Sequence, residues 1–388
     1  MNLIDRLKKS AIIYVFPFLA LILAIFAKET SHAARSALYL SLDVVIPSLF
    51  PFFVLSRLTV PFLKNFKCPK FIKFLIEKIF RLPYYTIIIM VLGYLSGYPT
   101  GAKLARDMFD EGLIDNNQAS KIIAVANNCS PLFLIGTIGA GLFKSIKIGF
   151  FLLLIHWLSG IIAGFITINL SCSEELKDKA LEKGFYKQNT GSKEKPHIFY
   201  LLPGAVEDAA ILCIKVSGYI IFFAVISELL SRTGLFTAIG NFISLIIAGE
   251  PGQGKTSELV TALFKGVLEI TSGSQAISQL NYYSLSIKLA LISLICGFAG
   301  FSVHTQIMGI MKGSKARYKV LIGGKFLHGV IAFILTLLIA KISPMTIQVS
   351  NTAVLALTDF SGVRLITVTV LILSLLFAPY KTENKLKQ

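Results

Sequence analysis

The spacing of apolar and polar stretches along the chain predicts a series of membrane-spanning helices. Residues 11–26 carry no charged side chain, and residues 148–170 and 362–379 are nearly as apolar. A helix of roughly 20 apolar residues crosses the hydrocarbon core of a bilayer. Further apolar stretches predict spans at residues 38–60, 119–143, 207–230, 284–311 and 320–341. The pattern therefore predicts an all-α polytopic membrane protein with about eight transmembrane helices.

Glycine, proline and polar residues interrupt four of the apolar stretches. Residues 84–113 are broken at "SGYPTG" and residues 258–282 at "TSGSQA", which predicts two re-entrant hairpins. Residues 119–143 and 284–311 are long enough to cross but contain polar clusters, so each is predicted to be an interrupted helix. Non-helical backbone at membrane depth is tolerated only where protein or water covers it.

The order of these elements is the same in the two halves of the chain: a span, a broken hairpin, an interrupted helix and a span. The predicted topology places the hairpins on opposite sides of the membrane, so the halves form an inverted repeat, as in many secondary transporters. Five parts are predicted: an N-terminal transmembrane helix (1–30), a first repeat (31–170), a charged cytoplasmic linker (171–198), a second, inverted repeat (199–342), and a C-terminal transmembrane helix with a basic tail (343–388).

Composition agrees with a membrane protein. Hydrophobic residues make up 54% of the 388 residues and charged residues only 15%, against about 25% charged in a typical soluble domain. A formal net charge of +17 would suggest nucleic acid as the partner of a soluble protein. Here the basic residues lie mostly in short loops, where they set the orientation and place the N-terminus in the cytoplasm. The expected partner is therefore the lipid bilayer, not nucleic acid.

Three segments near the spans have their own predicted shapes. Pro47 and Pro51 remove backbone donors from the span at 38–60 and should kink it. Residues 63–81 alternate lysines with apolar residues, which predicts a cytoplasmic amphipathic helix on the inner leaflet. Residues 231–257 are predicted to form a loop with an amphipathic piece.

Residues 249–256, "GEPGQGKT", match the phosphate-binding loop pattern of Gly, four residues, Gly, Lys and Ser or Thr. That loop works only with a strand before it, a helix after it and an α/β domain around both. No alternation of strands and helices surrounds this stretch, so it is interpreted as a simple loop. An ATPase that uses Lys255 stays open as the enzymatic alternative; no enzyme activity and no cofactor are expected.

The broken elements carry the candidate substrate-binding residues. Where a helix unwinds in the membrane, its free N–H groups can hold an anion and its free carbonyls a cation. The hairpins contribute Ser96, Gly97, Tyr98, Pro99, Thr100 and Gly101, and Thr271, Ser272, Gly273, Ser274 and Gln275. The interrupted helices contribute Asn127, Asn128, Ser130, Ser302, His304 and Gln306. The alternative interpretation is that the small residues only allow close helix packing.

Charged residues inside apolar sequence are a second group of candidates, because burying charge in a membrane is costly. Glu269 directly precedes the second break and could bind a coupling proton or cation, or the substrate. Lys215 and Lys103 could neutralise an anion, or their side chains could extend to the interface. Glu228 belongs to the same group.

The remaining polar residues indicate neither a catalytic site nor a metal site. His156 and His328 lie alone in apolar stretches and are interpreted as packing or hydrogen-bonded residues. The five cysteines have no paired spacing, so neither a disulfide framework nor a zinc site is predicted.

Four stretches resemble the YlbJ/SpoVV family of sporulation integral membrane proteins: "VIPSLFPFFVLSRL", "GYLSGYPTGAKLA", "NNCSPLFLIGTIG" and "LEITSG". The resemblance covers about residues 35–340. Proteins of this family carry the gate, or nucleoside-recognition, domain and are similar to concentrative nucleoside transporters. One departure is that "CGFAGFSVHTQ" in the second half stands where the first half has "NNCSP", so the two halves are not chemically equivalent.

The resemblance implies a role in endospore formation, in which dipicolinate (pyridine-2,6-dicarboxylate) crosses the outer forespore membrane from the mother cell. The residues themselves fit a small, flat anion, since two helix breaks and nearby lysines could each face one carboxylate. The prediction is therefore a secondary transporter or facilitator of a small organic anion. A nucleoside or nucleobase transporter and a non-transporting scaffold of spore envelope assembly are the alternatives. The coupling ion, proton or sodium, and a homo-oligomeric state are left open.

Overall fold

The part of the chain that the structure describes folds into helices and the turns between them. The computed structural model describes residue 13 and residues 16–65, 68–178, 198–249 and 254–342, and no strand occurs within these ranges. In the same ranges, five helices are long and apolar enough to cross a membrane, or six if one bent pair counts as a span. The all-α membrane class is thus confirmed.

The predicted number of about eight spans is not reached in the described residues. The span predicted at 362–379 lies outside them. Part of the span predicted at 11–26 also lies outside them, and its described part includes the short apolar helix Phe16–Ile25. The interrupted helix predicted at 119–143 consists of two short pieces, of which Leu132–Leu142 is apolar.

The first long helix runs from Ala27 to Leu63 and is longer than the predicted span at 38–60. It comprises α2 (Ala27–Leu40), the π-helical turn η1 (Ser41–Val45) and α3 (Ile46–Thr59), and the 3₁₀ segment η2 (Val60–Asn65) follows. The chain stays helical through Pro47 and Pro51. The wider π-helical turn just before Pro47 is the local adjustment that the prolines require.

The amphipathic helix predicted at 63–81 begins later, at Lys70, directly after Pro69. It comprises α4 (Lys70–Phe74) and the π-helical segment η3 (Leu75–Ile79), which the 3₁₀ turn η4 (Tyr84–Thr86) follows. One face is buried through Ile76, whereas Phe71 and Phe74 on the other are exposed. This segment meets the next helix at an angle of 97°.

The first half contains a broken hairpin and an interrupted helix in the predicted places. The hairpin consists of α5 (Ile87–Ser96) and α6 (Thr100–Asp110), and the interrupted helix consists of α7 (Asn116–Val125) and the π-helical segment η5 (Leu132–Leu142). The long helix α8 (Ile146–Asp178) follows and extends past the predicted end at 170. Residues 171–178 of the predicted linker are therefore helical, and residues 179–197 lie outside the described ranges.

The second half repeats this order after two further helices. α9 (Ile198–Arg232) is longer than the predicted span at 207–230, and α10 (Leu235–Ala248) is the helical piece within 231–257. The second hairpin consists of α11 (Lys255–Leu268) and α12 (Ile270–Ser278). The second interrupted helix consists of α13 (Leu285–Phe298) and α14 (Gly300–Ile310), and α15 (Tyr318–Ile342) is the last described span.

The break of the second hairpin differs from the prediction. The chain leaves the helical conformation at Glu269, whereas "TSGSQA" was expected to be irregular and is instead the first part of α12. Gly and Ser are weak helix formers, but a residue that caps the first turn can still start a helix on them.

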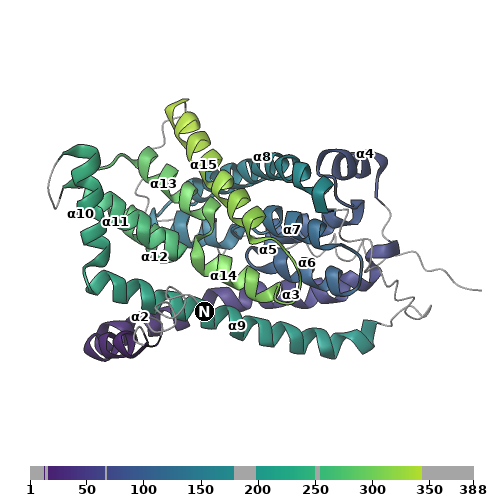
Figure 1. Cartoon of the computed structure of the whole chain (residues 1–388), viewed down its shortest axis with the longest axis horizontal. Coiled ribbons are helices and arrows are strands. Elements are labelled where there is room, and N and C mark those ends of the chain that lie inside the picture. The colour runs from purple at the N-terminus through teal and green to yellow at the C-terminus, as the bar shows by residue number, and fades with distance from the viewer. Residues whose placement is uncertain (1–12, 14–15, 66–67, 179–197, 250–253, 343–388) are drawn as a thin grey trace, which may run out of the picture.

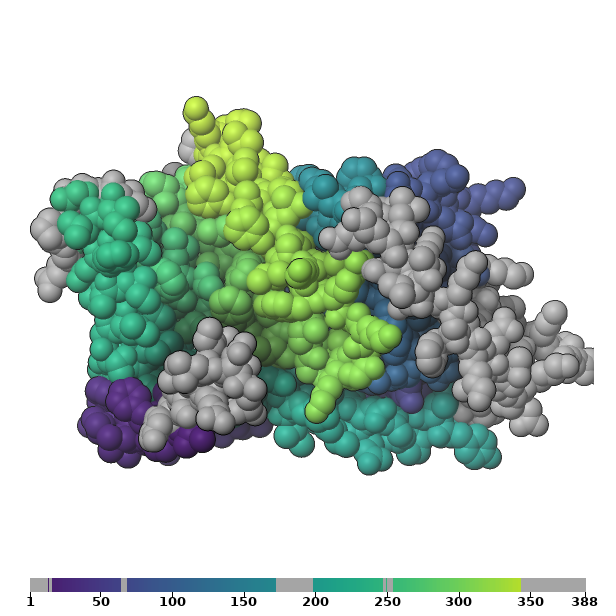
Figure 2. Space-filling view, viewed as in Figure 1, coloured from purple at the N-terminus to yellow at the C-terminus, as the bar shows by residue number. Residues whose placement is uncertain are grey.

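α15 packs against α13, α8 and α7. α9 packs against α2 and α3 and runs along the lower side of the molecule in Figure 1. The broken elements α5 and α6 lie to the right of the second hairpin, α11 and α12, in this view. The teal surface of α9 is open along the same side in Figure 2. Ile214 and Phe222 of this helix are exposed, as expected for a helix that faces lipid.

Two apolar clusters hold the broken elements in place. The first packs the first hairpin and α7 against α14, with Leu104, Ile123 and Ile307 fully buried. The second packs η5 and α8 against the second hairpin and α13, with Ile138, Ile277 and Ile292 fully buried. Each cluster therefore joins elements from the two halves of the chain.

Candidate functional site

The two hairpins and the two interrupted helices meet at a cavity of about 100 Å³. A volume of this kind holds several water molecules. Helices α3 and α9 close one side of it through apolar residues such as Leu49 and Val216. The polar residues that line the cavity are Ser48, Ser96, Tyr98, Ser130, Glu269, Thr271, Ser302 and Gln306. All but Ser48 belong to the residues that the sequence singles out.

Gly97 makes the first hairpin break possible. Its φ of +91° is a conformation that residues with a Cβ rarely adopt. A Cβ added to Gly97 would also lie 2.7 Å from the Cβ of Ser130. The hairpin therefore touches the break of the first interrupted helix through backbone. Beside it, the Tyr98 hydroxyl donates to the Cys296 carbonyl at 2.6 Å, which joins the hairpin tip to α13.

Glu269 closes the start of α12 in the second hairpin. Its two carboxylate oxygens accept the N–H groups of Thr271 at 2.8 Å and Ser272 at 2.7 Å, and its side chain is buried. A carboxylate at a helix N-terminus is stabilised by the free N–H groups and the helix dipole. The N-terminus of α12 is thus occupied by the protein's own carboxylate, which leaves less of it for a substrate anion than the sequence suggested.

The N-terminus of α6, in the first hairpin, is held differently. The side-chain oxygen of Asn127 accepts the Ala102 N–H at 3.0 Å, and its amide nitrogen donates to the Ile123 carbonyl at 2.8 Å. The side chain that caps α6 is therefore a neutral amide, whereas a charged carboxylate caps α12. Two residues further on in the break, the Cys129 N–H donates to Nε2 of His156 at 2.9 Å. Asn127 and His156 are both fully buried behind the cavity.

Lys325 is the polar residue of this region that the sequence reasoning missed. It lies in α15 and is 0% exposed. Its ammonium donates to the Asn127 carbonyl and lies 3.4 Å from the side-chain oxygen of Asn128. A lysine inside the apolar run 320–341 carries the same signal as Lys215, so the sequence offered a way to find it.

The structure brings about half of the predicted residues to the cavity. Of the others, Asn128 donates its amide N–H to the Val125 carbonyl at 2.9 Å, within the first interrupted helix. Nε2 of His304 donates to the Phe298 carbonyl at 2.8 Å, across the break between α13 and α14. Gly273 packs against the backbone of Gly266, as the packing interpretation expects, and Lys215 is exposed on α9. The predicted residues that do not line the cavity are Pro99, Thr100, Gly101, Asn127, Asn128, Lys215, Ser272, Gly273, Ser274, Gln275 and His304.

The histidines thought to pack singly lie together instead. The rings of His156 on α8 and His328 on α15 have centroids 4.4 Å apart, and Nε2 of His328 donates to the His156 carbonyl at 3.0 Å. Because His156 accepts the Cys129 N–H at Nε2, a neutral His156 carries its proton on Nδ1.

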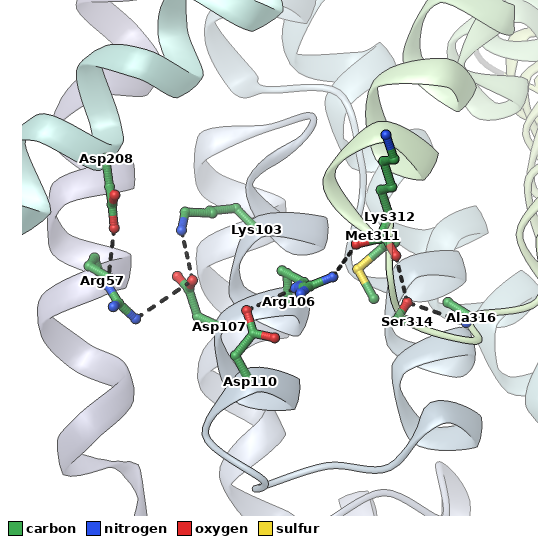
Figure 3. Close-up of polar contacts among 10 residues, drawn as sticks. All are labelled: Arg57, Lys103, Arg106, Asp107, Asp110, Asp208, Met311, Lys312, Ser314 and Ala316. Atoms are coloured by element: carbon green, nitrogen blue, oxygen red, sulfur yellow. Dashed lines mark hydrogen bonds and ion pairs between the residues drawn. The ribbon is translucent and has the colours of Figure 1, made fainter.

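A charged network lies between α3, α6 and α9 (Figure 3). Lys103 pairs with Asp107 at 2.7 Å, and Arg57 lies 3.8 Å from Asp107 and 3.3 Å from Asp208. Burial raises the pKa of the Asp107 carboxyl, although the two cations lower it. Lys103 is therefore engaged by a carboxylate of its own helix. Glu228, another charge noted in the sequence, pairs with Arg232 at 2.7 Å.

The segment that matches the phosphate-binding loop lacks the required surroundings. The run before it forms the helix α10, which ends at Gly249, where a phosphate-binding fold has a strand. Residues 250–253 lie outside the described residues. Lys255 begins α11 and is exposed, with its Nζ 5.1 Å from the centroid of the Tyr282 ring. Within the described ranges no group of His, Cys, Asp and Glu residues could hold a metal ion.

Fold and cavity together define a multi-pass membrane protein in which paired broken helices surround a central, partly polar cavity. The chain is 30% identical over 356 residues to the sporulation integral membrane protein YlbJ of Bacillus subtilis (strain 168). The matched region covers 88% of this chain and 85% of that protein. The chain therefore belongs to the YlbJ family of sporulation integral membrane proteins. No protein-family model matches it, and no solved structure does.

Proposed function

We propose that the protein is a secondary transporter or facilitator of a small organic anion, with dipicolinate as the expected substrate and the outer forespore membrane as the expected location. The observation that carries the proposal is the cavity at which both hairpins and both interrupted helices meet. Secondary transporters bind substrates near the midplane, at discontinuous helices of two repeats. The equal order of broken elements in the two halves supports an inverted repeat here.

The cavity suits a small, flat molecule with polar edges. Val44, Leu49, Phe133 and Val216 offer apolar surface for a ring, while the hydroxyl groups of Ser130, Thr271 and Ser302 can donate to carboxylate oxygens. These hydroxyls come from the first interrupted helix, the second hairpin and the second interrupted helix. An anion could therefore be held by each half of the chain at once, which is what alternating access requires.

The charge balance of the cavity is compatible with an anion. Among the described residues, Glu269 is the only charged residue that lines it, and two backbone N–H groups of α12 offset that charge. Lys325, which does not line the cavity, can supply positive charge near it: its Nζ lies 5.7 Å from the centroid of the Tyr98 ring, and Tyr98 lines the cavity.

The test is uptake of radiolabelled dipicolinate by proteoliposomes that contain the purified full-length protein. Uptake above that of protein-free liposomes, competed by unlabelled dipicolinate, is the expected result. Uptake competed by nucleosides instead would favour the nucleoside carrier. A folded protein that takes up neither compound under any ion gradient would contradict the proposal and favour the scaffold of the spore envelope.

A Lys255→Ala variant is expected to take up dipicolinate at the rate of the wild type. Lys255 is exposed, and its contact with the Tyr282 ring contributes only about 0.5–1 kcal/mol at such a site. The same proteoliposomes, measured with and without ATP, provide the readout. Uptake that depends on ATP and is lost in the variant would contradict the interpretation of residues 249–256 as a simple loop.

A further inference from the structure

Lys325 joins the two halves of the chain at the break of the first interrupted helix. Its Nζ donates to the Asn127 carbonyl, a group that the break frees from helical hydrogen bonding, and approaches the side-chain oxygen of Asn128. Asn127 in turn caps α6 of the first hairpin. The side chain of Lys325 is therefore held in one position, beside the elements that form the cavity.

No carboxylate of the described residues lies within ion-pair distance of Lys325. The titratable groups that face it are His328 on the same helix, His156 on α8, His304 on α14, Cys129 at the break and Tyr98 in the first hairpin. Both an amine and an ammonium can donate to the Asn127 carbonyl. The site thus accepts Lys325 with or without its extra proton.

His156 does not have this freedom. Its Nε2 lone pair already accepts the Cys129 N–H, so a proton on Nε2 would break the contact that shapes the first interrupted helix. Lys325, by contrast, gains or loses a proton while its hydrogen bond to Asn127 persists. Unlike His156, Lys325 is therefore able to change its charge in the described conformation.

Lys325 lies close to a residue of the cavity wall. Nζ of Lys325 is 5.7 Å from the centroid of the Tyr98 ring, and Tyr98 lines the cavity. Charges inside a protein interact much more strongly than in water, because the effective dielectric constant is about 20 or less. An anion in the cavity would therefore favour the ammonium form of Lys325.

We propose that Lys325 is a proton-binding site coupled to the cavity, so that the protein binds a proton together with its anionic substrate. This rests on the proposed function. The proton adds to the lone pair of Nζ when the anion binds and leaves to water when the anion leaves. Because coupling is reciprocal, protonation raises the affinity for the anion by the same factor as the anion raises the affinity for the proton, roughly tenfold for charges about 10 Å apart.

The test is calorimetric titration of the purified full-length protein with dipicolinate, in pairs of buffers that differ in ionisation enthalpy, between pH 6 and pH 8. The expected result is uptake of protons by the wild type on binding, and affinity that falls as pH rises. Lys325→Met is expected to bind roughly tenfold more weakly, without proton uptake. Lys325→Arg keeps a permanent charge, so it binds without proton uptake and without the pH dependence.

Proton uptake that persists in Lys325→Met would overturn the proposal, since another group would then bind the proton. Failure of the wild type to bind dipicolinate at any pH would instead contradict the proposed substrate. Lys325 is then judged by the fluorescence of Trp157, the single tryptophan of the chain, whose ring lies 6.4 Å from that of Tyr94 next to this region. A pH transition lost in Lys325→Met supports the proposal, and an unchanged or absent transition overturns it.

Discussion

A Gly97→Ala variant is expected to lose about 2–5 kcal/mol of unfolding free energy, from a positive-φ backbone conformation that essentially only glycine adopts and from overpacking. At this position φ is +91°, and the added Cβ would lie 2.7 Å from the Ser130 Cβ and 2.8 Å from its backbone nitrogen. Ser130 cannot easily retreat, because its carbonyl accepts the N–H groups of Phe133 and Leu134. The measurement is the midpoint of thermal unfolding in detergent.

Gly218→Ala is the matched control. Gly218 lies inside α9 and has no atom within 4 Å of an added Cβ, so alanine there should leave stability unchanged or raise it by up to about 1 kcal/mol. If Gly97→Ala unfolded at the same temperature as this control, the hairpin would be free to move away from Ser130. The contact between the two breaks would then not hold the cavity.

The sequence predicted the two breaks of the first half well because their signal is local. Glycine and proline in "SGYPTG" and the polar residues after Val125 conflict with an uninterrupted helix wherever they stand. Both breaks therefore occur close to the predicted places. The ends of the long helices were less predictable: α8 continues to Asp178, beyond the apolar run that predicted it.

The face of a helix on which a charge lies could not be predicted. Lys215 and Lys325 each interrupt an apolar run, yet Lys215 is exposed on α9 and Lys325 is fully buried in α15. Both helices leave one face open, and the difference comes from the face on which each lysine lies: Lys325 lies on the packed face of α15, which contacts α7, α8 and α13, and Lys215 lies on the open face of α9. The pairing of His156 with His328 likewise depends on the packing of α8 against α15.

The function of Glu269 shows the same limit. Its place before a break marked it as important, but the sequence did not say that its carboxylate caps α12. A side chain can cap the helix that follows it only if its own residue, the N-cap, has a non-helical backbone conformation. Glu269 has one, with φ of −147° and ψ of 121°.

A Glu269→Gln variant is expected to lose about 2–4 kcal/mol of unfolding free energy, because hydrogen bonds to a charged group contribute about 1.5–3 kcal/mol each. The glutamine oxygen can accept one of the two N–H groups, at Thr271 or Ser272, while its amide turns a donor toward the other. Since Glu269 and Thr271 line the cavity, dipicolinate uptake should fall as well. Thermal unfolding and proteoliposome uptake are measured on the same preparation.

Two further variants separate capping from a direct role of Glu269 in transport. Aspartate is a favoured N-cap residue, so Glu269→Asp should restore stability to within about 1 kcal/mol, and with it most of the uptake. Glu258→Gln removes an exposed carboxylate from neighbouring α11 and should change neither property. If Glu269→Gln were as stable as the wild type yet inactive, and Glu269→Asp were also stable but inactive, the carboxylate would bind substrate or a coupling ion. The hydrogen bonds of Glu269 to α12 would then form only when neither substrate nor coupling ion is bound.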